Sequence, residues 1–97
     1  MPIIRIVKMT FREEEIPSFI ELFSERKDQI RNFPGCSHLE LWQHEKEKNV
    51  FFTYSIWNDS IHLDHYRFSE FFKETWSLTR AKFQTRAEAW TLNNLNI

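Results

Sequence analysis

The chain has 97 residues, which is the length of one domain, and a chain this short buries only about 60–65 % of its unfolded surface. Thirteen basic and fourteen acidic residues give a net charge of −1, and no long block of one sign is present. This balance argues against nucleic-acid binding, which uses a basic stripe to neutralise phosphates. No apolar run approaches the roughly 20 residues that cross a bilayer, and no signal-peptide pattern is present, so no membrane association is expected.

We expect one domain over residues 1–97, located in the cytoplasm. The single cysteine, Cys36, excludes an internal disulfide and fits a reducing compartment. Aromatic residues make up 16 % of the chain, and each ring can bury roughly 150–250 Å². A core of this size cannot cover every ring, so the composition favours self-association or a ligand pocket.

A first strand is predicted over residues 2–11, where β-branched and other apolar residues dominate. One face of this strand carries Ile3, Arg5, Val7, Met9 and Phe11. The other face carries Ile4, Ile6, Lys8 and Thr10. Because both faces are largely apolar, we expect both to be covered.

A helix is predicted over residues 15–32. Its start is acidic, which suits the helix dipole, and Pro17 is tolerated only in a first turn. An apolar stripe at helical spacing follows, and the string Phe33-Pro34-Gly35 ends the helix.

The remaining elements follow from alternation, turn residues and capping residues. Two strands are predicted over residues 36–44 and 50–57, joined by a polar hairpin. Two helical segments are predicted over 60–67 and 69–83, with a restart at Ser69, and a last strand over 87–92.

The predicted order is therefore β-α-β-β-α-β, an α+β domain of the ferredoxin-like kind. This order gives a four-stranded antiparallel sheet with the helices on one face. The second face is left bare, although neither face of the first or third strand is predominantly polar. A second copy of the same sheet is the simplest cover, so we expect an isologous homodimer.

Several local strings resemble the antibiotic biosynthesis monooxygenase superfamily of dimeric α/β barrels. They lie in the first strand, before the second strand, in the third strand and its exit, in the second helical region and near the end. The strings are Ile6-Val7-Lys8-Met9-Thr10-Phe11, Phe33-Pro34-Gly35-Cys36, Phe52-Thr53-Tyr54-Ser55-Ile56-Trp57 with Asn58-Asp59-Ser60, then Tyr66, Ser69 and Phe71-Phe72-Lys73, and Glu88-Ala89-Trp90.

The resemblance covers residues 2–92 and implies a pocket between the sheet and the helices of each subunit. It also implies oxygenation of aromatic or quinol substrates with no metal and no flavin, so no cofactor is expected. The haem-degrading branch of the superfamily has an Asn, a Trp and a haem-ligating His, and this chain has Val7, Tyr66 and Trp76 at those positions. Because Trp cannot ligate iron, that mechanism is not expected.

Arg5 is the one charged residue on a strand face that the resemblance turns toward the pocket. A guanidinium there would hold a carboxylate, a phenolate or a developing oxyanion. The alternative is a side chain that extends to the sheet edge and pairs with a carboxylate.

Oxygenation without a cofactor needs a group that removes a phenolic proton and donors that stabilise the resulting anion. His62 and Tyr66 are the catalytic candidates, because a histidine titrates near neutral pH and a phenol donates a hydrogen bond. Arg5 and His38 are candidates for polar contacts with the substrate, and Phe72 and Trp76 for stacking on its ring. The alternatives are plain core packing for the aromatic residues and surface positions for the histidines.

The spacing of His62 and His65 places both on one helix face, but no third ligand is tied to the pair, so no metal site is expected. Two hypotheses therefore remain open. The first is a cofactor-independent monooxygenase acting on a small hydroxylated aromatic or quinol. The second is a non-catalytic dimeric module that binds a small aromatic ligand.

Overall fold

Strand β1 (Ile3–Phe11) lies inside a four-stranded sheet in the computed structural model, which describes residues 1–97. The strand order is β2-β3-β1-β4, with β2 (Cys36–Gln43), β3 (Val50–Trp57) and β4 (Phe83–Leu92). All neighbouring strands run antiparallel. The predicted ferredoxin-like α+β fold is confirmed.

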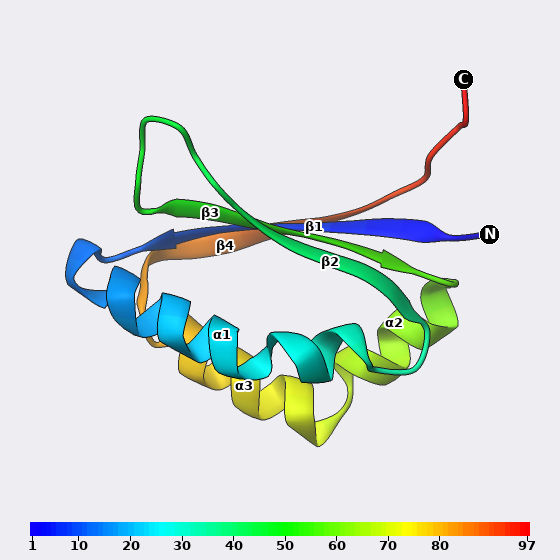
Figure 1. The fold of residues 1–97 in the computed structure, drawn as a ribbon, viewed down its shortest axis with the longest axis horizontal. Coiled ribbons are helices and arrows are strands. Elements are labelled where there is room, and N and C mark those ends of the chain that lie inside the picture. The colour runs from blue at the N-terminus through cyan, green and yellow to red at the C-terminus, as the bar shows by residue number, and fades with distance from the viewer.

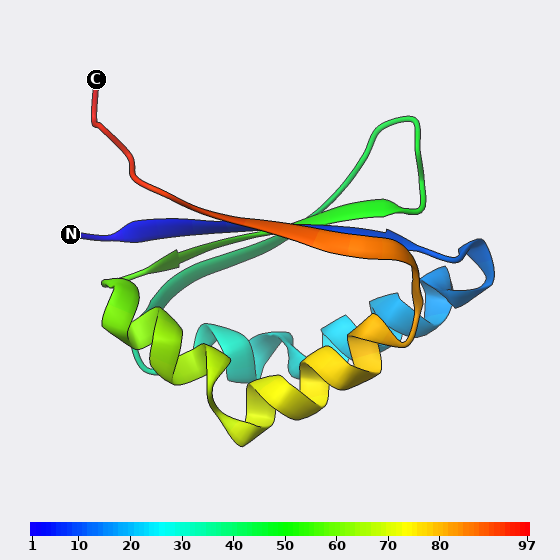
Figure 2. The same cartoon turned by 180° about the vertical axis from the view of Figure 1, so that it is seen from behind.

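The helices cover one face of this sheet (Figures 1 and 2). They are the 3-10 turn η1 (Glu13–Glu15), α1 (Ile16–Arg31), α2 (Ser60–Arg67) and α3 (Glu70–Arg80). None of them is long and apolar enough to cross a membrane.

A capping residue starts each of the two later helices. The Asp59 carboxylate accepts a hydrogen bond from the His62 amide at 2.9 Å, and the Ser69 hydroxyl accepts one from the Phe72 amide at 3.1 Å. Such caps satisfy amides that have no partner inside the helix. The predicted restart at Ser69 is therefore confirmed, and the chain turns between α2 and α3.

The end of α3 and the start of β4 differ from the prediction. The helix ends at Arg80, and β4 begins at Phe83, four residues before the predicted strand. The Arg12 guanidinium donates to the carbonyl oxygens of Ala81 and Phe83 at 3.1 and 3.2 Å, which holds the turn between them. The early part of β4 is irregular against β1, so its sequence lacks the alternation that identifies a strand.

The main core lies under the helix-covered face of the sheet. Phe11 and Phe19 stack with ring centroids 4.1 Å apart, and Phe51 meets both rings edge-on. A second cluster joins Ile3, Trp57 and the α2 residue Leu63.

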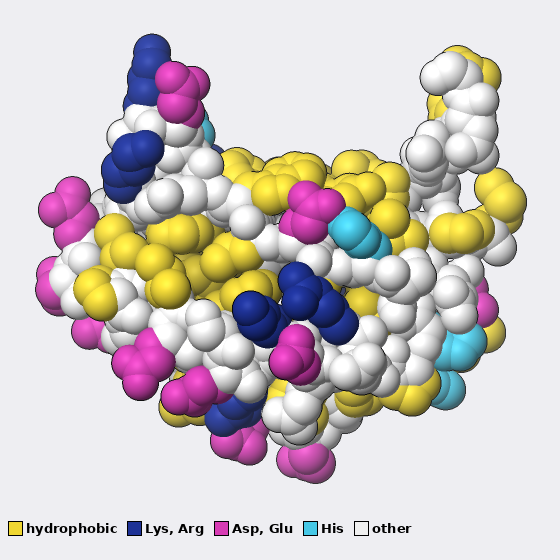
Figure 3. Space-filling view, viewed as in Figure 1, with side chains coloured by type: hydrophobic (Ala, Val, Ile, Leu, Met, Phe, Trp, Pro, Cys, Tyr) yellow, Lys and Arg dark blue, Asp and Glu magenta, His cyan; other side chains and the backbone are white.

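No helix covers the opposite face of the sheet, which we call the open face. The register of β1 places Ile4 and Ile6 on it, away from the core. Trp42 and Trp90 lie on the same face and expose 44 % and 42 % of their surface. Figure 3 shows hydrophobic side chains gathered along the upper edge of the molecule, between the raised hairpin and the C-terminal segment. The predicted apolar character of both faces is thus present in the structure.

Gly35 provides the first testable prediction, because it has φ +89° and packs directly against the start of α2. A Cβ at this position would overlap the His62 side chain. We expect Gly35→Ala to lower the free energy of unfolding by about 2–3 kcal/mol, measured by urea denaturation. The loss should be smaller in a His62→Gly background, where the overlap is removed. An equal loss in both backgrounds would contradict the steric explanation.

Candidate functional site

A cavity of about 90 Å³ lies between the helix-covered face of the sheet and the helices. Most of its lining is apolar and comes from the sheet and all three α-helices. Its polar lining residues are Arg5, Thr53, Ser55, Tyr66 and Arg67. The enclosed space thus combines an apolar wall with two guanidinium groups and three hydroxyl groups.

Arg5 extends from the middle of the sheet into this cavity. Its Nη1 donates a hydrogen bond to the Thr91 hydroxyl at 2.9 Å, and no carboxylate pairs with it. The nearby Arg67 lies 3.9 Å from Asp64. Burial, and then the positive charge of Arg67, lower the pKa of Arg5. An anionic ligand in the cavity would act against both effects, because an opposite charge nearby favours the charged guanidinium.

Tyr66 contributes the phenol that lines the cavity. Its ring stacks on Trp57 with centroids 4.8 Å apart and meets Phe72 edge-on at 5.0 Å. The hydroxyl forms no hydrogen bond within the protein, and its oxygen keeps some accessible surface. Burial raises its pKa far above the ordinary value for tyrosine. Tyr66 therefore stays protonated and is suited to donate a hydrogen bond rather than to remove a proton.

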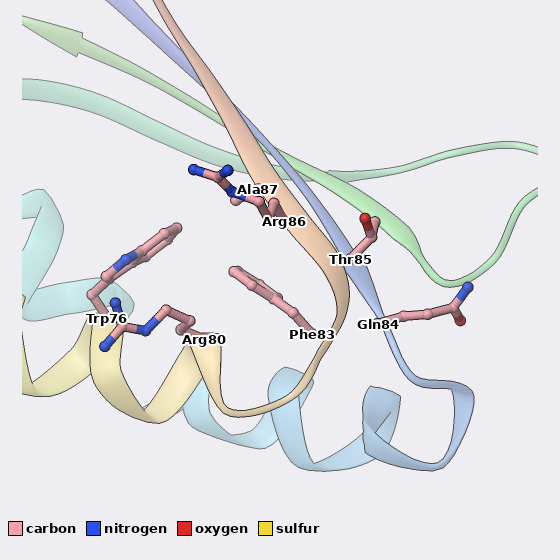
Figure 4. A pocket seen from close by; sticks show the side chains of 7 residues that line it. All are labelled: Trp76, Arg80, Phe83, Gln84, Thr85, Arg86 and Ala87. Carbon is pink, nitrogen blue, oxygen red and sulfur yellow. The ribbon is translucent and has the colours of Figure 1, made fainter.

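An open groove of about 520 Å³ lies beside the cavity, between α3 and the first half of β4 (Figure 4). Trp76 and Phe83 form its aromatic wall, with ring centroids 5.6 Å apart. Trp76 also stacks on Phe72, at 5.9 Å and an interplanar angle of 9°. Because Phe72 lines the cavity, this stacked pair stands between the cavity and the groove.

The predicted site residues fall into two groups. Arg5, Tyr66 and Phe72 line the cavity, and Trp76 lines the adjoining groove. The two histidines lie elsewhere and do not line the cavity.

His62 lies at the start of α2, where its Nδ1 is 2.8 Å from the Asp59 carboxylate. Hydrogen bonds from His62 lower the pKa of Asp59. His38 lies on the open face, where it contacts Glu40 and meets the Tyr54 ring edge-on. His62 lies on α2 and Trp76 on α3, and the turn between these helices separates them.

Arg67, Arg80 and Arg86 are polar lining residues that the sequence did not single out. Arg67 follows Tyr66 directly, so its position beside the candidate phenol was the one available signal. Arg80 and Arg86 resemble solvated surface charges in a sequence, because only the packing of α3 against β4 creates the groove between them.

The other titratable candidates form no metal site and no activated nucleophile. The rings of His62 and His65 lie 6.4 Å apart, and no group of three or more metal-ligating side chains is present. Burial raises the pKa of the Cys36 thiol, which disfavours the reactive thiolate.

Residues 2–76 match the sequence model of the family described as antibiotic biosynthesis monooxygenase. Since this match spans more than half of the chain, the protein belongs to the antibiotic biosynthesis monooxygenase family.

Solved structures share the fold over nearly the whole chain. A conserved protein from Methanosarcina mazei has a TM-score of 0.92 at 19 % identity, covering 97 % of this chain and 93 % of that one. A structure described as an antibiotic biosynthesis monooxygenase has a TM-score of 0.89 at 20 % identity, covering 96 % and 98 %. SnoaB, a cofactor-independent oxygenase from Streptomyces nogalater, has a TM-score of 0.87 at 14 % identity, covering 99 % of this chain and 95 % of that one. Comparison with curated proteins finds no match.

The raised pKa of Tyr66 predicts a specific loss of stability in alkali. Unfolded tyrosine loses its proton near pH 10, whereas the buried phenol keeps it, so folding opposes ionisation. The contribution of the protonated Tyr66 phenol to the free energy of unfolding is fully present below pH 10. Above pH 10 this contribution should fall by about 1.4 kcal/mol per pH unit. Urea denaturation between pH 8 and 11 should show this extra loss in the wild type but not in Tyr66→Phe. Parallel curves for both proteins would contradict the prediction.

Proposed function

We propose that the protein is a monooxygenase that uses neither metal nor flavin and acts on a small hydroxylated aromatic or quinol substrate. The observation that carries this proposal is the cavity in which the Tyr66 phenol and the Arg5 guanidinium line the same apolar space. Membership of the family supports an oxygenase, and the cavity supports an aromatic substrate that can ionise.

The arrangement favours an anionic form of the substrate. Arg5 and Arg67 place two positive charges at the cavity, which lower the pKa of a bound phenol or quinol. The Tyr66 hydroxyl is free to donate a hydrogen bond to the resulting oxyanion. No histidine or carboxylate lines the cavity, so the proton passes to solvent instead of to a dedicated base. His62 and His38 have no direct part in this scheme.

The substrate anion supplies the electrons itself. It transfers one electron to O2, and the two radicals combine at a ring carbon to form a peroxide, whose O–O bond breaks in the next step. When a quinol leaves as the hydroxyquinone, one oxygen atom enters the product and the other leaves as water with the two hydrogens that are lost. The quinol loses four electrons in total, two for the new carbon–oxygen bond and two for the water, and O2 accepts all four, so this stoichiometry needs no external reductant.

The size of the site sets a condition on this proposal. A cavity of about 90 Å³ is smaller than the roughly 150 Å³ that holds benzene in an engineered core. The adjoining groove of about 520 Å³ lies within the roughly 300–1,000 Å³ usual for ligand pockets. We propose that the substrate enters from the groove and displaces the Phe72–Trp76 pair. This displacement would join the groove and the cavity into one space.

Oxygen uptake with a panel of anthrones, quinols and naphthols tests the activity. We expect turnover in the presence of a chelator, and a decrease of about 10²-fold in kcat for Arg5→Met and for Tyr66→Phe, because each removes one stabilising contact to the oxyanion. His62→Ala serves as the matched control, because His62 lies outside the cavity. Turnover no faster than the protein-free rate across the whole panel would refute the proposal.

The second candidate function is a binding module without catalysis. It is favoured by the lack of any histidine or carboxylate among the residues that line the cavity. A ligand at 100 times its Kd should stabilise the protein by about 2.7 kcal/mol. Thermal shifts with panel compounds, with no product and no oxygen consumption, would favour this function over the oxygenase.

We also propose that the protein is a homodimer in which the open faces of two sheets pack together. The support is the set of large exposed side chains on that face, which includes Trp42, Trp90 and Leu92. Exposed apolar surface of this kind is covered most simply by an identical surface across a two-fold axis. The resemblance to a superfamily of dimeric α/β barrels also supports a dimer.

Sedimentation of Trp90→Glu tests the dimer. We expect the variant to be a monomer at concentrations where the wild type is a dimer, because a buried carboxylate at the interface would lack a partner. Phe68→Glu is the matched control, since Phe68 exposes 70 % of its surface and follows α2 on the helical side of the molecule. A wild type that sediments as a monomer would refute the proposal.

A further inference from the structure

The groove between α3 and β4 contains two arginines that have no partner. Arg80 and Arg86 line it together with five other residues, none of which is acidic. Neither guanidinium forms a hydrogen bond or an ion pair. Every other arginine of the chain has a side-chain or backbone partner within the protein. The two unpaired guanidinium groups therefore lie in the same groove.

The backbone of β4 places Arg86 there. Glu88 pairs with Lys8 and Thr85 pairs with Thr10, so Arg86 and Ala87 together lie opposite the single residue Met9. Such a bulge redirects side chains and is common beside functional sites. Because Met9 belongs to the buried core, Arg86 lies over the helix-covered side of the sheet. Figure 4 shows Arg86 from the strand and Arg80 from the helix both reaching toward Trp76.

The wall between the two arginines is aromatic. Phe83 meets Trp76 edge-on, with an interplanar angle of 72°. Guanidinium groups bind carboxylates through paired N–H donors, and aromatic side chains bind planar rings. A groove that offers both, and no competing carboxylate, is suited to a planar ring that carries an acidic group.

We propose that this groove binds the acidic substituent of an aromatic ligand, with Arg80 and Arg86 holding a carboxylate and Trp76 contacting the ring. The inference rests on the proposed function, because the ring of the same ligand reaches the cavity through the Phe72–Trp76 pair. It adds the ligand class: an aromatic hydroxy acid in preference to the neutral phenol.

Isothermal titration with a matched pair of compounds tests this inference. The pair is 2-naphthol and 6-hydroxy-2-naphthoate, which differ by one carboxylate. At low ionic strength we expect the wild type to bind the carboxylate about tenfold more tightly. The preference should shrink as salt is added, because screening weakens exposed ion pairs.

Variants assign the preference to the groove. The double variant Arg80→Met/Arg86→Met should lose the preference and keep its affinity for 2-naphthol. Both side chains are exposed and unpaired, so the variant should fold, which circular dichroism checks. Arg31→Met is the matched control, because Arg31 is an exposed arginine that lies outside the cavity and the groove, and it should keep the preference.

The possible results separate this inference from the proposed function. If both compounds bind the wild type equally, the acidic-ligand inference is wrong and the aromatic site stands. If neither compound binds, the acidic-ligand inference fails, and the oxygen-uptake panel alone decides the proposed function. If the double variant keeps the preference, the carboxylate binds elsewhere and the groove assignment is wrong. If the double variant alters sedimentation instead of ligand preference, the groove is a contact between subunits.

Discussion

A continuous row of aromatic contacts holds α2 and α3 against the sheet. It runs from Trp57 through Tyr66, Phe72 and Trp76 to Phe83, and neighbouring ring centroids lie 4.8 to 5.9 Å apart. Rings are bulky and have few rotamers, so the row fixes the spacing between helices and sheet. The rings do not fill all the space between the helices and the sheet. The cavity remains on the Phe72 side of the stacked Phe72–Trp76 pair, and the groove remains on the Trp76 side. The same contacts that stabilise the fold thus define the site and its separating wall.

Electrostatics then determine what this space can hold. Arg5 and Arg67 line the cavity, and Arg80 and Arg86 line the groove, although the chain as a whole carries a net charge of −1. Tyr66 adds a protonated phenol, because burial raises its pKa. A site with several hydrogen-bond donors and no base favours a ligand that is already anionic in solution or that loses a proton on binding. The reactivity in such a scheme belongs to the substrate anion, and the protein contributes charge, exclusion of water and orientation.

Much of the fold could be predicted from sequence because its signals are local. The alternation in β1 identified both faces, the string Phe33-Pro34-Gly35 ended α1 close to the observed residue, and Ser69 marked the break between α2 and α3. The start of β4 could not be predicted, because a bulge removes the alternation there. For the site, Arg5, Tyr66, Phe72 and Trp76 line the cavity or the groove, since they follow the periodicity of their own elements. His62 and His38 do not, because a turn between helices and the choice of sheet face depend on tertiary packing.

The bulge in β4 affects which residues lie on each face of the sheet. If the pairing of Glu88 with Lys8 continued regularly, Ala87 would lie opposite Met9 and Arg86 opposite Thr10. Arg86 would then point to the open face, where a dimer would bury one more charge at a cost in desolvation. The extra residue shifts Arg86 to the helix-covered side, where it lines the groove in contact with water. This irregularity in an edge strand therefore keeps one more charge out of the proposed interface and gives the proposed ligand site its second guanidinium. On this view, the two faces of the sheet are specified together, and a change that made β4 regular would affect both association and ligand preference.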